Sequence, residues 1–286
     1  MKNFKNFTAA LLFAFTLCFL ISCQPEDNPK DNGDTALTVD ASFTITPVSG
    51  ATNRYLLTAA TKDVIGSRWN LGDGTPDYTG RMTETIFLPD AGTYTITHTA
   101  IGRGGATNTA TKLISIATSD PVAGNLVRGG KFSNAADHAQ WTRLSIGSGN
   151  ATSWVFNSGS ASVFGGSWNQ QGLYQIINVV AGRKYKIDLV VSGGGSQNTW
   201  FEVYANAATP VQGVDYTAGG RRMGLSTWDG CANTSFAGLL SAKGCVGSGG
   251  EITFTQSGPI TFLIKCGGEN IGASGITMTN VEMRGM

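Results

Sequence analysis

The chain has 286 residues, of which 39 are glycine and 14% are charged. At about 100 to 200 residues per domain, this length is enough for two hydrophobic cores. The formal net charge is +1 and the sequence has no run of Lys and Arg. This argues against nucleic-acid binding, which needs a clustered basic surface. The charge balance is compatible with binding of neutral polymers such as glycans, because these ligands do not require a charged protein surface.

The N-terminus carries a short apolar stretch. Two lysines precede an apolar stretch of 15 residues, Phe7 to Ile21, and roughly 20 would be needed to span a bilayer. The pattern therefore predicts a signal peptide over residues 1–22. It ends in Leu20-Ile-Ser-Cys23, which resembles a bacterial lipobox. The resemblance implies cleavage before Cys23 and acylation of its thiol, and two or more acyl chains would anchor the protein stably. The alternative is an ordinary secretory signal.

The residues after Cys23 predict an exposed location. Gln24-Pro-Glu-Asp27 resembles the acidic export signal that sends some lipoproteins of Bacteroidota to the outer face of the outer membrane. Residues 23–36 are rich in Asp, Asn, Pro and Gly, which is typical of a flexible, solvated tether. We therefore expect a lipid-anchored protein of the outer membrane that faces the cell exterior.

The next stretch, residues 37–117, predicts a first folded domain. Its short apolar runs alternate with polar residues and are bounded by Gly, Pro and Asp clusters. This pattern predicts half-buried antiparallel strands of a β-sandwich. The runs are Phe43–Ile45, Tyr55–Leu57, Trp69–Leu71, Tyr94–His98 and Leu113–Ile116.

Two motifs in this domain carry a family resemblance. Trp69-Asn-Leu-Gly-Asp-Gly-Thr75, followed by Pro89-Asp-Ala-Gly-Thr-Tyr94, closely resembles the PKD family of immunoglobulin-like domains. The resemblance implies a core Trp, a tight turn at Asp73 and a spacer module without chemistry of its own. Trp69 and His98 are accordingly expected to be structural. The sequence departs from the family at Asn70-Leu71, where an Asp and an aromatic residue are usual.

A short linker, residues 118–124, leads to a second predicted domain, residues 125–286. Asn125 to Phe132 resembles the opening strand of jelly-roll carbohydrate-binding modules of the family 4/16/22 type, and Gly275 to Glu282 resembles their last strand. Further alternating strands are predicted between them, which implies two antiparallel sheets packed face to face. These strands are Tyr185–Val191, Ile252–Phe254 and Ile260–Cys266.

The sequence departs from these modules at the positions of a calcium site. The modules often use a Glu after the opening Phe and an Asp in the last strand. Here the positions hold Ser133 and Thr279, which lack the carboxylates that a hard cation favours. We therefore predict no metal and no cofactor. Trp141 is assigned to the core.

The predicted fold is all-β, with an N-terminal immunoglobulin-like (PKD) β-sandwich followed by a jelly-roll β-sandwich. This layout resembles the surface glycan-binding lipoproteins of Bacteroidota polysaccharide-utilisation systems, notably those for β-1,3-glucans (laminarin) or mixed-linkage β-glucans. The resemblance implies capture of a polysaccharide, with surface glycosidases and a glycan importer as partners.

Three aromatic stretches of the second domain predict a sugar-binding surface. The stretches hold Trp168 with Asn169, Gln170 and Gln171, then Trp200 with Glu202 and Tyr204, then Trp228. Aromatic planes stack on the C–H faces of a pyranose, while amides and carboxylates bond its hydroxyls. The strand period places Trp200, Glu202 and Tyr204 on one face. The alternative is that these side chains are core residues or ordinary cross-strand neighbours. Trp154 is a further platform candidate.

The cysteines predict one disulfide. Cys231 and Cys245 lie 14 positions apart in a chain expected to enter an oxidising compartment. Their bridge would close a loop of about 15 residues and stiffen the base of Trp228. Cys266 is expected to be a buried free thiol, although its pairing with Cys231 or Cys245 is the alternative. Cys18 leaves with the signal peptide.

The sequence does not predict an enzyme. Glycosidases normally use two carboxylates across the scissile bond, and no acidic residue of the second domain lies in a catalytic motif. His138 lacks a Cys or Ser partner. The alternatives are an adhesin or scaffold that uses protein contacts, and a hydrolase that uses Glu202. The acidic residues considered are Asp137, Asp188, Glu202, Asp215, Asp229, Glu251, Glu269 and Glu282.

Overall fold

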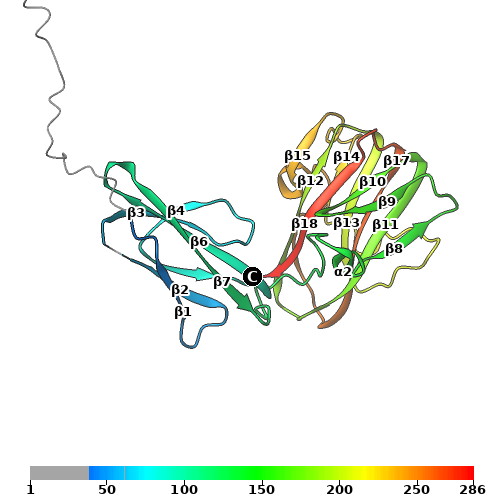
Figure 1. Cartoon of the computed structure of the whole chain (residues 1–286). Coiled ribbons are helices and arrows are strands. Elements are labelled where there is room, and N and C mark those ends of the chain that lie inside the picture. The colour runs from blue at the N-terminus through cyan, green and yellow to red at the C-terminus, as the bar shows by residue number, and fades with distance from the viewer. Residues whose placement is uncertain (1–38, 61) are drawn as a thin grey trace, which may run out of the picture. The chain divides into compact units, whose positions relative to one another are not determined.

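The computed structural model describes residues 39–60 and 62–286 (Figure 1). The predicted signal peptide, the acylated Cys23 and the tether lie outside these residues and stay predictions. Within the described part of the chain, no helix is long and apolar enough to cross a membrane.

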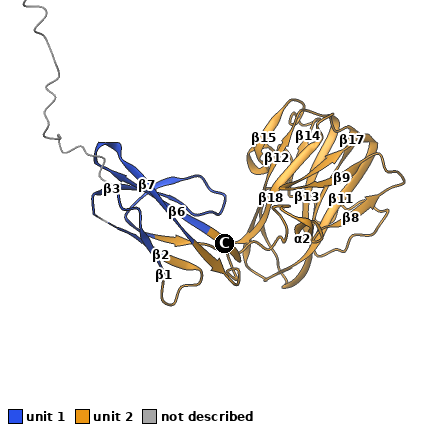
Figure 2. Ribbon diagram, viewed as in Figure 1, with its two compact units in different colours: residues 1–46, 56–84, 95–112 blue, residues 47–55, 85–94, 113–286 orange. Residues whose placement is uncertain are grey.

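The described residues group into two compact units, shown in different colours in Figure 2. One unit comprises the residues up to Thr46 together with Leu56–Glu84 and Thr95–Lys112. The other comprises Pro47–Tyr55, Thr85–Tyr94 and Leu113–Met286. The domain boundaries expected from the sequence stay predictions.

Seven strands occupy the stretch that the sequence assigns to the first domain. They form a three-stranded sheet in the order β1-β2-β5 and a four-stranded sheet in the order β4-β3-β6-β7. All five predicted strands are found among them. The strands are β1 (Phe43–Pro47), β2 (Arg54–Ala59), β3 (Val64–Asn70), β4 (Tyr78–Gly80), β5 (Thr83–Phe87), β6 (Gly92–Gly102) and β7 (Thr107–Ile116), and a short 3-10 helix, η1 (Arg103–Gly105), follows β6.

Trp69 and His98 are structural, as predicted. They are paired across β3 and β6, both are buried, and their rings stack with centroids 4.3 Å apart. The His98 ring contacts the Ala41 carbonyl oxygen through Nδ1 at 2.8 Å and the Ser67 hydroxyl through Nε2 at 2.9 Å. Both ring nitrogens thus have hydrogen-bond partners inside a core, and neither is free to act as an acid, a base or a ligand.

The predicted turn at Asp73 is also confirmed. Gly72 and Gly74 have φ of 68° and 98°, values that glycine adopts without strain. The Asp73 carboxylate accepts hydrogen bonds from the backbone N–H and the hydroxyl of Thr75, at 2.9 and 2.6 Å. The side chain therefore closes the turn locally, as Asp commonly does.

The remaining strands form two antiparallel sheets. One has the order β15-β12-β18-β10-β9, with β16 also paired to β12, and the other has the order β14-β13-β17-β11-β8. Two four-residue helices, α2 (Ala135–His138) and α3 (Leu240–Lys243), accompany them. The strands are β8 (Thr142–Ile146), β9 (Ser153–Asn157), β10 (Ser160–Phe164), β11 (Gly166–Val179), β12 (Lys184–Gly193), β13 (Gln197–Asn206), β14 (Met223–Ser226), β15 (Phe236–Leu239), β16 (Glu251–Thr253), β17 (Gly258–Asn270) and β18 (Ile276–Gly285).

One core joins these two sheets. Ile187 and Met283 of the six-stranded sheet and Phe201 and Ile264 of the five-stranded sheet are fully buried in the same apolar cluster. Alternate residues of the central strands supply that cluster, so each sheet buries one face against the other. The described chain is therefore all-β and built from sandwiches, as the sequence predicts.

The expected opening strand at 125–132 is wrong. This segment is a run of turns, because Gly129 and Phe132 have φ of 63° and 54°, which no extended strand permits. The segment still lies along β18. The Asn125 side chain donates to the Val281 carbonyl oxygen and accepts from the Met283 N–H, both at 3.0 Å.

A long loop covers part of the five-stranded sheet on the side away from the core, here called the outer face. Residues 207–222 leave β13 and reach β8, where Gly213 bridges to Ile146. Tyr216 of the loop belongs to a second buried cluster that includes Tyr204 and Leu263. The central part of the outer face is therefore packed, and the end of the sheet beyond Trp200 is left open.

Candidate ligand-binding surface

Three indoles form a continuous group at the open end of the sheet, here called the platform: Trp168, Trp200 and Trp228. Trp228 is the middle member. Its ring centroid lies 6.4 Å from that of Trp168 and 6.1 Å from that of Trp200, with interplanar angles of 28° and 30°. Despite these contacts, Trp168 is 62% and Trp228 55% exposed, whereas Trp200 is half-buried. The sequence prediction that these three residues gather on one surface is confirmed.

Trp168 is presented by a β-bulge. Trp168 lies in the first part of β11, whose pairing with β17 shifts register between Gly166 and Asn169. Ser167 and Trp168 have φ of 55° and 58°. A left-handed conformation in an aromatic residue costs about 1 to 3 kcal/mol and persists where the surrounding structure fixes it.

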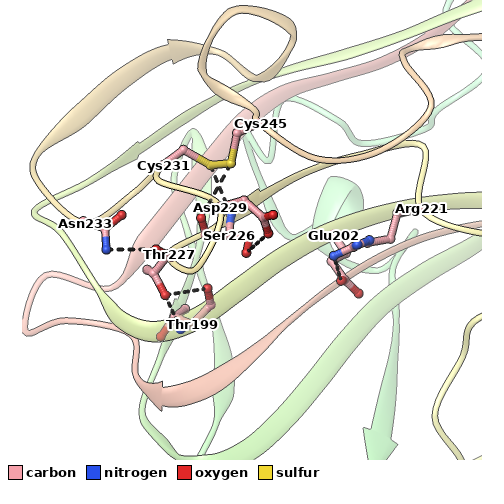
Figure 3. The surroundings of a disulfide bond; sticks show 9 residues. All are labelled: Thr199, Glu202, Arg221, Ser226, Thr227, Asp229, Cys231, Asn233 and Cys245. Atoms are coloured by element: carbon pink, nitrogen blue, oxygen red, sulfur yellow. Dashed lines mark hydrogen bonds and ion pairs between the residues drawn. A yellow bond between two sulfur atoms is a disulfide. The ribbon is translucent and has the colours of Figure 1, made fainter.

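Trp228 lies in a tightly braced turn, and Figure 3 shows its neighbours Ser226, Thr227 and Asp229. The Ser226 hydroxyl donates to Asp229 at 2.5 Å, and the Cys231 N–H donates to the Ser226 carbonyl oxygen at 3.2 Å. Thr227 is held from both sides, because its hydroxyl accepts from the Thr199 N–H at 3.0 Å and its carbonyl oxygen from Asn233 at 3.1 Å. The residues next to the indole are thus fixed although the indole is exposed.

The predicted disulfide joins this turn to the following segment. Cys231 and Cys245 are bonded, and the Cys245 N–H donates to the carbonyl oxygen of Gly224 in β14 at 3.0 Å. Cys266 is a buried free cysteine, as predicted. Burial, and then the neighbouring Glu202 carboxylate, raise the pKa of its thiol far above the ordinary value.

Trp200 lies over a glycine of the neighbouring strand. A Cβ added to Gly267 would come within 2.8 Å of the Trp200 ring and 2.4 Å of the Gln170 Cβ. The absent side chain therefore leaves room for the indole on the sheet. Gln170 lies on the same face, opposite Gly267, and its Oε1 is buried without a hydrogen-bond partner among the described residues.

The other two predicted amides have structural partners. The Asn169 Oδ1 accepts from the Thr152 N–H and the Gln171 Oε1 from the Trp154 N–H, both at 3.0 Å. Strand alternation turns these two side chains away from the face of Gln170. The prediction that all three amides surround the platform is therefore wrong: only Gln170 shares its face.

Glu202 and Tyr204 share the face of Trp200 but are not open to solvent. Glu202 is 7% exposed and Tyr204 3% exposed. The carboxylate pairs with Arg221 at 3.2 Å and with Lys265 at 3.5 Å, and it accepts from the Tyr204 hydroxyl at 2.8 Å. Burial, together with this hydrogen bond, raises the pKa of Tyr204. The strand period places both residues on the right face, and the expectation that they contact a ligand is corrected because residues 207–222 cover them.

The same network accounts for a buried lysine. Lys265 is 3% exposed, and its ammonium group lies 2.6 Å from Asp215 of the covering loop. It also lies 5.1 Å from the centroid of the Tyr204 ring. Glu202 and Asp215 therefore both neutralise one buried cation. A glycosidase acid must be free to give up a proton, and these carboxylates are held in ion pairs instead.

Trp154 is a core residue, which corrects its prediction as a platform candidate. It is 1% exposed, and its Nε1–H donates to the Gln171 carbonyl oxygen at 3.0 Å. Trp141 is also buried, as predicted. His138 contacts the carbonyl oxygens of Phe132 and Asn157 through Nε2. Over residues 39–60 and 62–286, no group of three or more His, Cys, Asp or Glu side chains could hold a metal ion.

Two polar residues at the platform were not predicted as ligand contacts. Asn198 and Glu269 are hydrogen-bonded to each other at 2.5 Å on strands β13 and β17, which carry Trp200 and Gly267. Asn198 lies two positions before Trp200, but its left-handed backbone, with φ of 46°, departs from the strand alternation that would have pointed to it. Glu269 could not be placed beside it, because the pairing of distant strands is not visible in the sequence.

Comparison with known proteins identifies one part of the chain. Residues 36–115 match the PKD domain, so the predicted resemblance of this stretch is confirmed. The class defined by fold and surface is thus an all-β protein with a PKD domain and a second sandwich that carries exposed indoles. None of the curated proteins compared with the chain matches it.

Several solved structures resemble the chain distantly. A carbohydrate-binding module of the β-sandwich superfamily, described as having promiscuous specificity, is 15% identical with a TM-score of 0.32, covering 85% of this chain and 97% of its own. A module of family CBM4 is 16% identical with a TM-score of 0.28, covering 56% and 99%. Tailspike protein 4 of bacteriophage CBA120 is 16% identical with a TM-score of 0.34, covering 60% and 23%. These likenesses are too distant to assign a ligand to this chain.

Proposed function

We propose that the protein is a non-catalytic glycan-binding lipoprotein of the cell surface. In this proposal Cys23 anchors it to the outer membrane, facing the exterior, and the platform captures a β-glucan, either β-1,3-linked or mixed-linkage. Surface glycosidases and a glycan importer would then degrade and take up the captured chain. The observation that carries the proposal is the open group of Trp168, Trp200 and Trp228.

The shape of the platform favours a sugar over other ligands of aromatic sites. Neighbouring indoles meet at only 28° and 30°, so they present roughly parallel faces. A cage for a quaternary ammonium group needs aromatic walls that surround the cation. Roughly parallel, solvent-exposed indoles instead offer successive apolar surfaces to the flat faces of linked rings.

The two alternatives lack a comparable observation. An adhesin or scaffold would be favoured by indoles that are buried or scattered, whereas these three are in contact and two are largely exposed. A hydrolase based on Glu202 would need that carboxylate to reach the substrate. Both of its oxygens are occupied by Arg221, Tyr204 and Lys265.

Affinity electrophoresis tests the proposal. The mature protein is run through native gels that contain laminarin, mixed-linkage β-glucan, xylan or mannan, with a polymer-free gel as reference. We expect retardation by at least one of the two β-glucans, with a dissociation constant in the micromolar range or weaker, about −6 to −8 kcal/mol. Equal mobility in every gel would contradict the proposal. Many tethered copies on one membrane would add avidity in the cell.

A further inference from the structure

A carboxylate and an amide, Glu269 and Asn198, lie on the two strands that carry Gly267 and Trp200. Asn198 lies on β13 two residues before Trp200 and has a left-handed backbone, with φ of 46°, and Glu269 lies on β17 two residues after Gly267. The pairing of Thr199 with Gly268 sets them side by side. The Asn198 Nδ2 donates to the Glu269 Oε2 at 2.5 Å.

The contact between Trp168 and Trp228 spans the two strands that carry this pair. Trp168 lies on β11 and Trp228 follows β14, and strands β17 and β13 lie between those two strands. Neighbouring strands are about 4.8 Å apart, so the indoles must reach inward across β17 and β13 to bring their centroids within 6.4 Å. The bulge places Ser167 and Trp168 opposite Glu269.

The pair retains free hydrogen-bonding capacity. Glu269 is exposed, and its second oxygen has no hydrogen bond to the described residues. An ionised carboxylate is an acceptor only, and an Asn side chain offers one carbonyl oxygen and two N–H donors. Such a pair can accept hydrogen bonds from two neighbouring hydroxyls of a ring that rests on the indoles.

The turn of Trp228 adds a second carboxylate near the platform. Asp229, in the turn of Trp228, is exposed like Glu269. Arg221, a cation of the covering loop, is paired with Glu202, which lies two residues beyond Trp200 on β13. A negatively charged substituent placed here would meet two carboxylates, and like charges close together are unfavourable.

We propose that Glu269, held by Asn198, is the specificity-determining residue of the platform: it binds hydroxyls of a neutral sugar ring and excludes rings that carry an anionic group. This inference rests on the proposed glycan-binding function. It names the ligand class as uncharged glycans, as distinct from sulfated or carboxylated ones.

The test compares laminarin with carboxymethylated laminarin, using the wild type, Glu269→Gln and Glu269→Lys. The control is Glu251→Gln, an exposed carboxylate on the other sheet that pairs with Lys184. Because a hydrogen bond to a charged group contributes about 1.5 to 3 kcal/mol, we expect Glu269→Gln to bind laminarin about tenfold more weakly. Its binding of the carboxymethylated polymer should be unchanged or stronger. Glu269→Lys should prefer the carboxymethylated polymer, and the control should match the wild type.

The outcomes separate this inference from the function on which it rests. Wild-type protein that binds laminarin supports the proposed function whatever the variants do. Equal weakening of both polymers by Glu269→Gln, or no weakening of either, would overturn the role of Glu269 in specificity. A Glu269→Lys variant that still prefers neutral laminarin would overturn it independently. A wild type that binds neither polymer would contradict both proposals.

Discussion

The outer face of the five-stranded sheet has two regions with opposite environments. At the sheet end, Trp200 adjoins two largely exposed indoles, Trp168 and Trp228. Only two residues further along β13, Glu202 is buried in an ion-pair network with Lys265. Both regions lie on the same strand and the same face of the sheet. They differ because the loop of residues 207–222 covers only the region of Glu202. The solvent exposure of side chains on this face thus depends on whether a loop covers the strand. The alternation of residues along the strand does not specify it.

The two regions differ in what a substitution should disturb. In the covered region, polar groups are satisfied internally, so their loss should affect folding. At the platform, large apolar surfaces face solvent, so their loss should affect ligand binding and leave stability nearly unchanged. The predictions that follow test this separation.

The largest effect is expected in the covered region. Lys265→Ala removes the buried cation between Glu202 and Asp215 and leaves the buried Glu202 carboxylate with Arg221, whose side chain is 43% exposed, as its cation partner. Breaking a buried ion pair in this way costs about 3 to 5 kcal/mol. Urea unfolding should show this loss of free energy, while any laminarin binding at the platform persists below the transition. A loss under about 1 kcal/mol would show that the network is solvated.

The disulfide should affect both regions at once. The double variant Cys231→Ala/Cys245→Ala opens a loop of about 15 residues, and the chain-entropy estimate for such a loop is about 3 kcal/mol. The turn of Trp228 also loses its covalent attachment, so glycan binding should weaken. Unfolding curves and affinity gels measure the two effects. Wild-type binding by a destabilised double variant would show that the remaining hydrogen bonds fix the turn.

At the platform, Trp228→Ala should separate binding from stability. The middle indole contacts both of its neighbours, so its removal should weaken glycan binding more than about tenfold, or about 1.4 kcal/mol. Its exposure limits the change in unfolding free energy to about 0.5 kcal/mol. The control is Ile176→Ala, an exposed apolar residue of the same sheet. Equal affinity in the two variants would argue against the platform.

The smallest effect is a loss of stability at alkaline pH. The thiol of Cys266 has an ordinary pKa of 9.0, and burial raises it in the folded protein. The unfolded chain therefore loses this proton first as the pH rises, so the stabilisation is complete below pH 9 and decreases above it. Between pH 8 and pH 10 we expect a loss of about 1 kcal/mol. Cys266→Val should remove most of this dependence. Tyr204, whose pKa is also raised, should contribute only above pH 10.

Whether a feature of the structure could be predicted from the sequence depends on how far apart in the chain the interacting residues lie. Period-two alternation was enough to set Trp200, Glu202 and Tyr204 on one face, and the spacing of Cys231 and Cys245 was enough to suggest their bond. The covering of Glu202 depends on contacts such as that between Asp215 and Lys265, which are 50 positions apart.

Local conformation explains the other differences. The left-handed bulge that presents Trp168 has no glycine at its two bulged positions to signal it. The amides of Asn169 and Gln171 bond to backbone groups 17 positions away. Trp154 reads in sequence like its exposed counterparts, and only the packing of the two sheets shows that it is core.

Oxidation of tryptophan by N-bromosuccinimide, located by mass spectrometry with and without laminarin or mixed-linkage glucan, tests the platform most directly and needs no variant. In the free protein, Trp168 and Trp228 should react first, and the buried Trp69, Trp141 and Trp154 last. Bound glycan should slow the oxidation of Trp168, Trp200 and Trp228 and leave the other three unchanged. Equal oxidation of the three platform residues with and without either glucan would contradict the account.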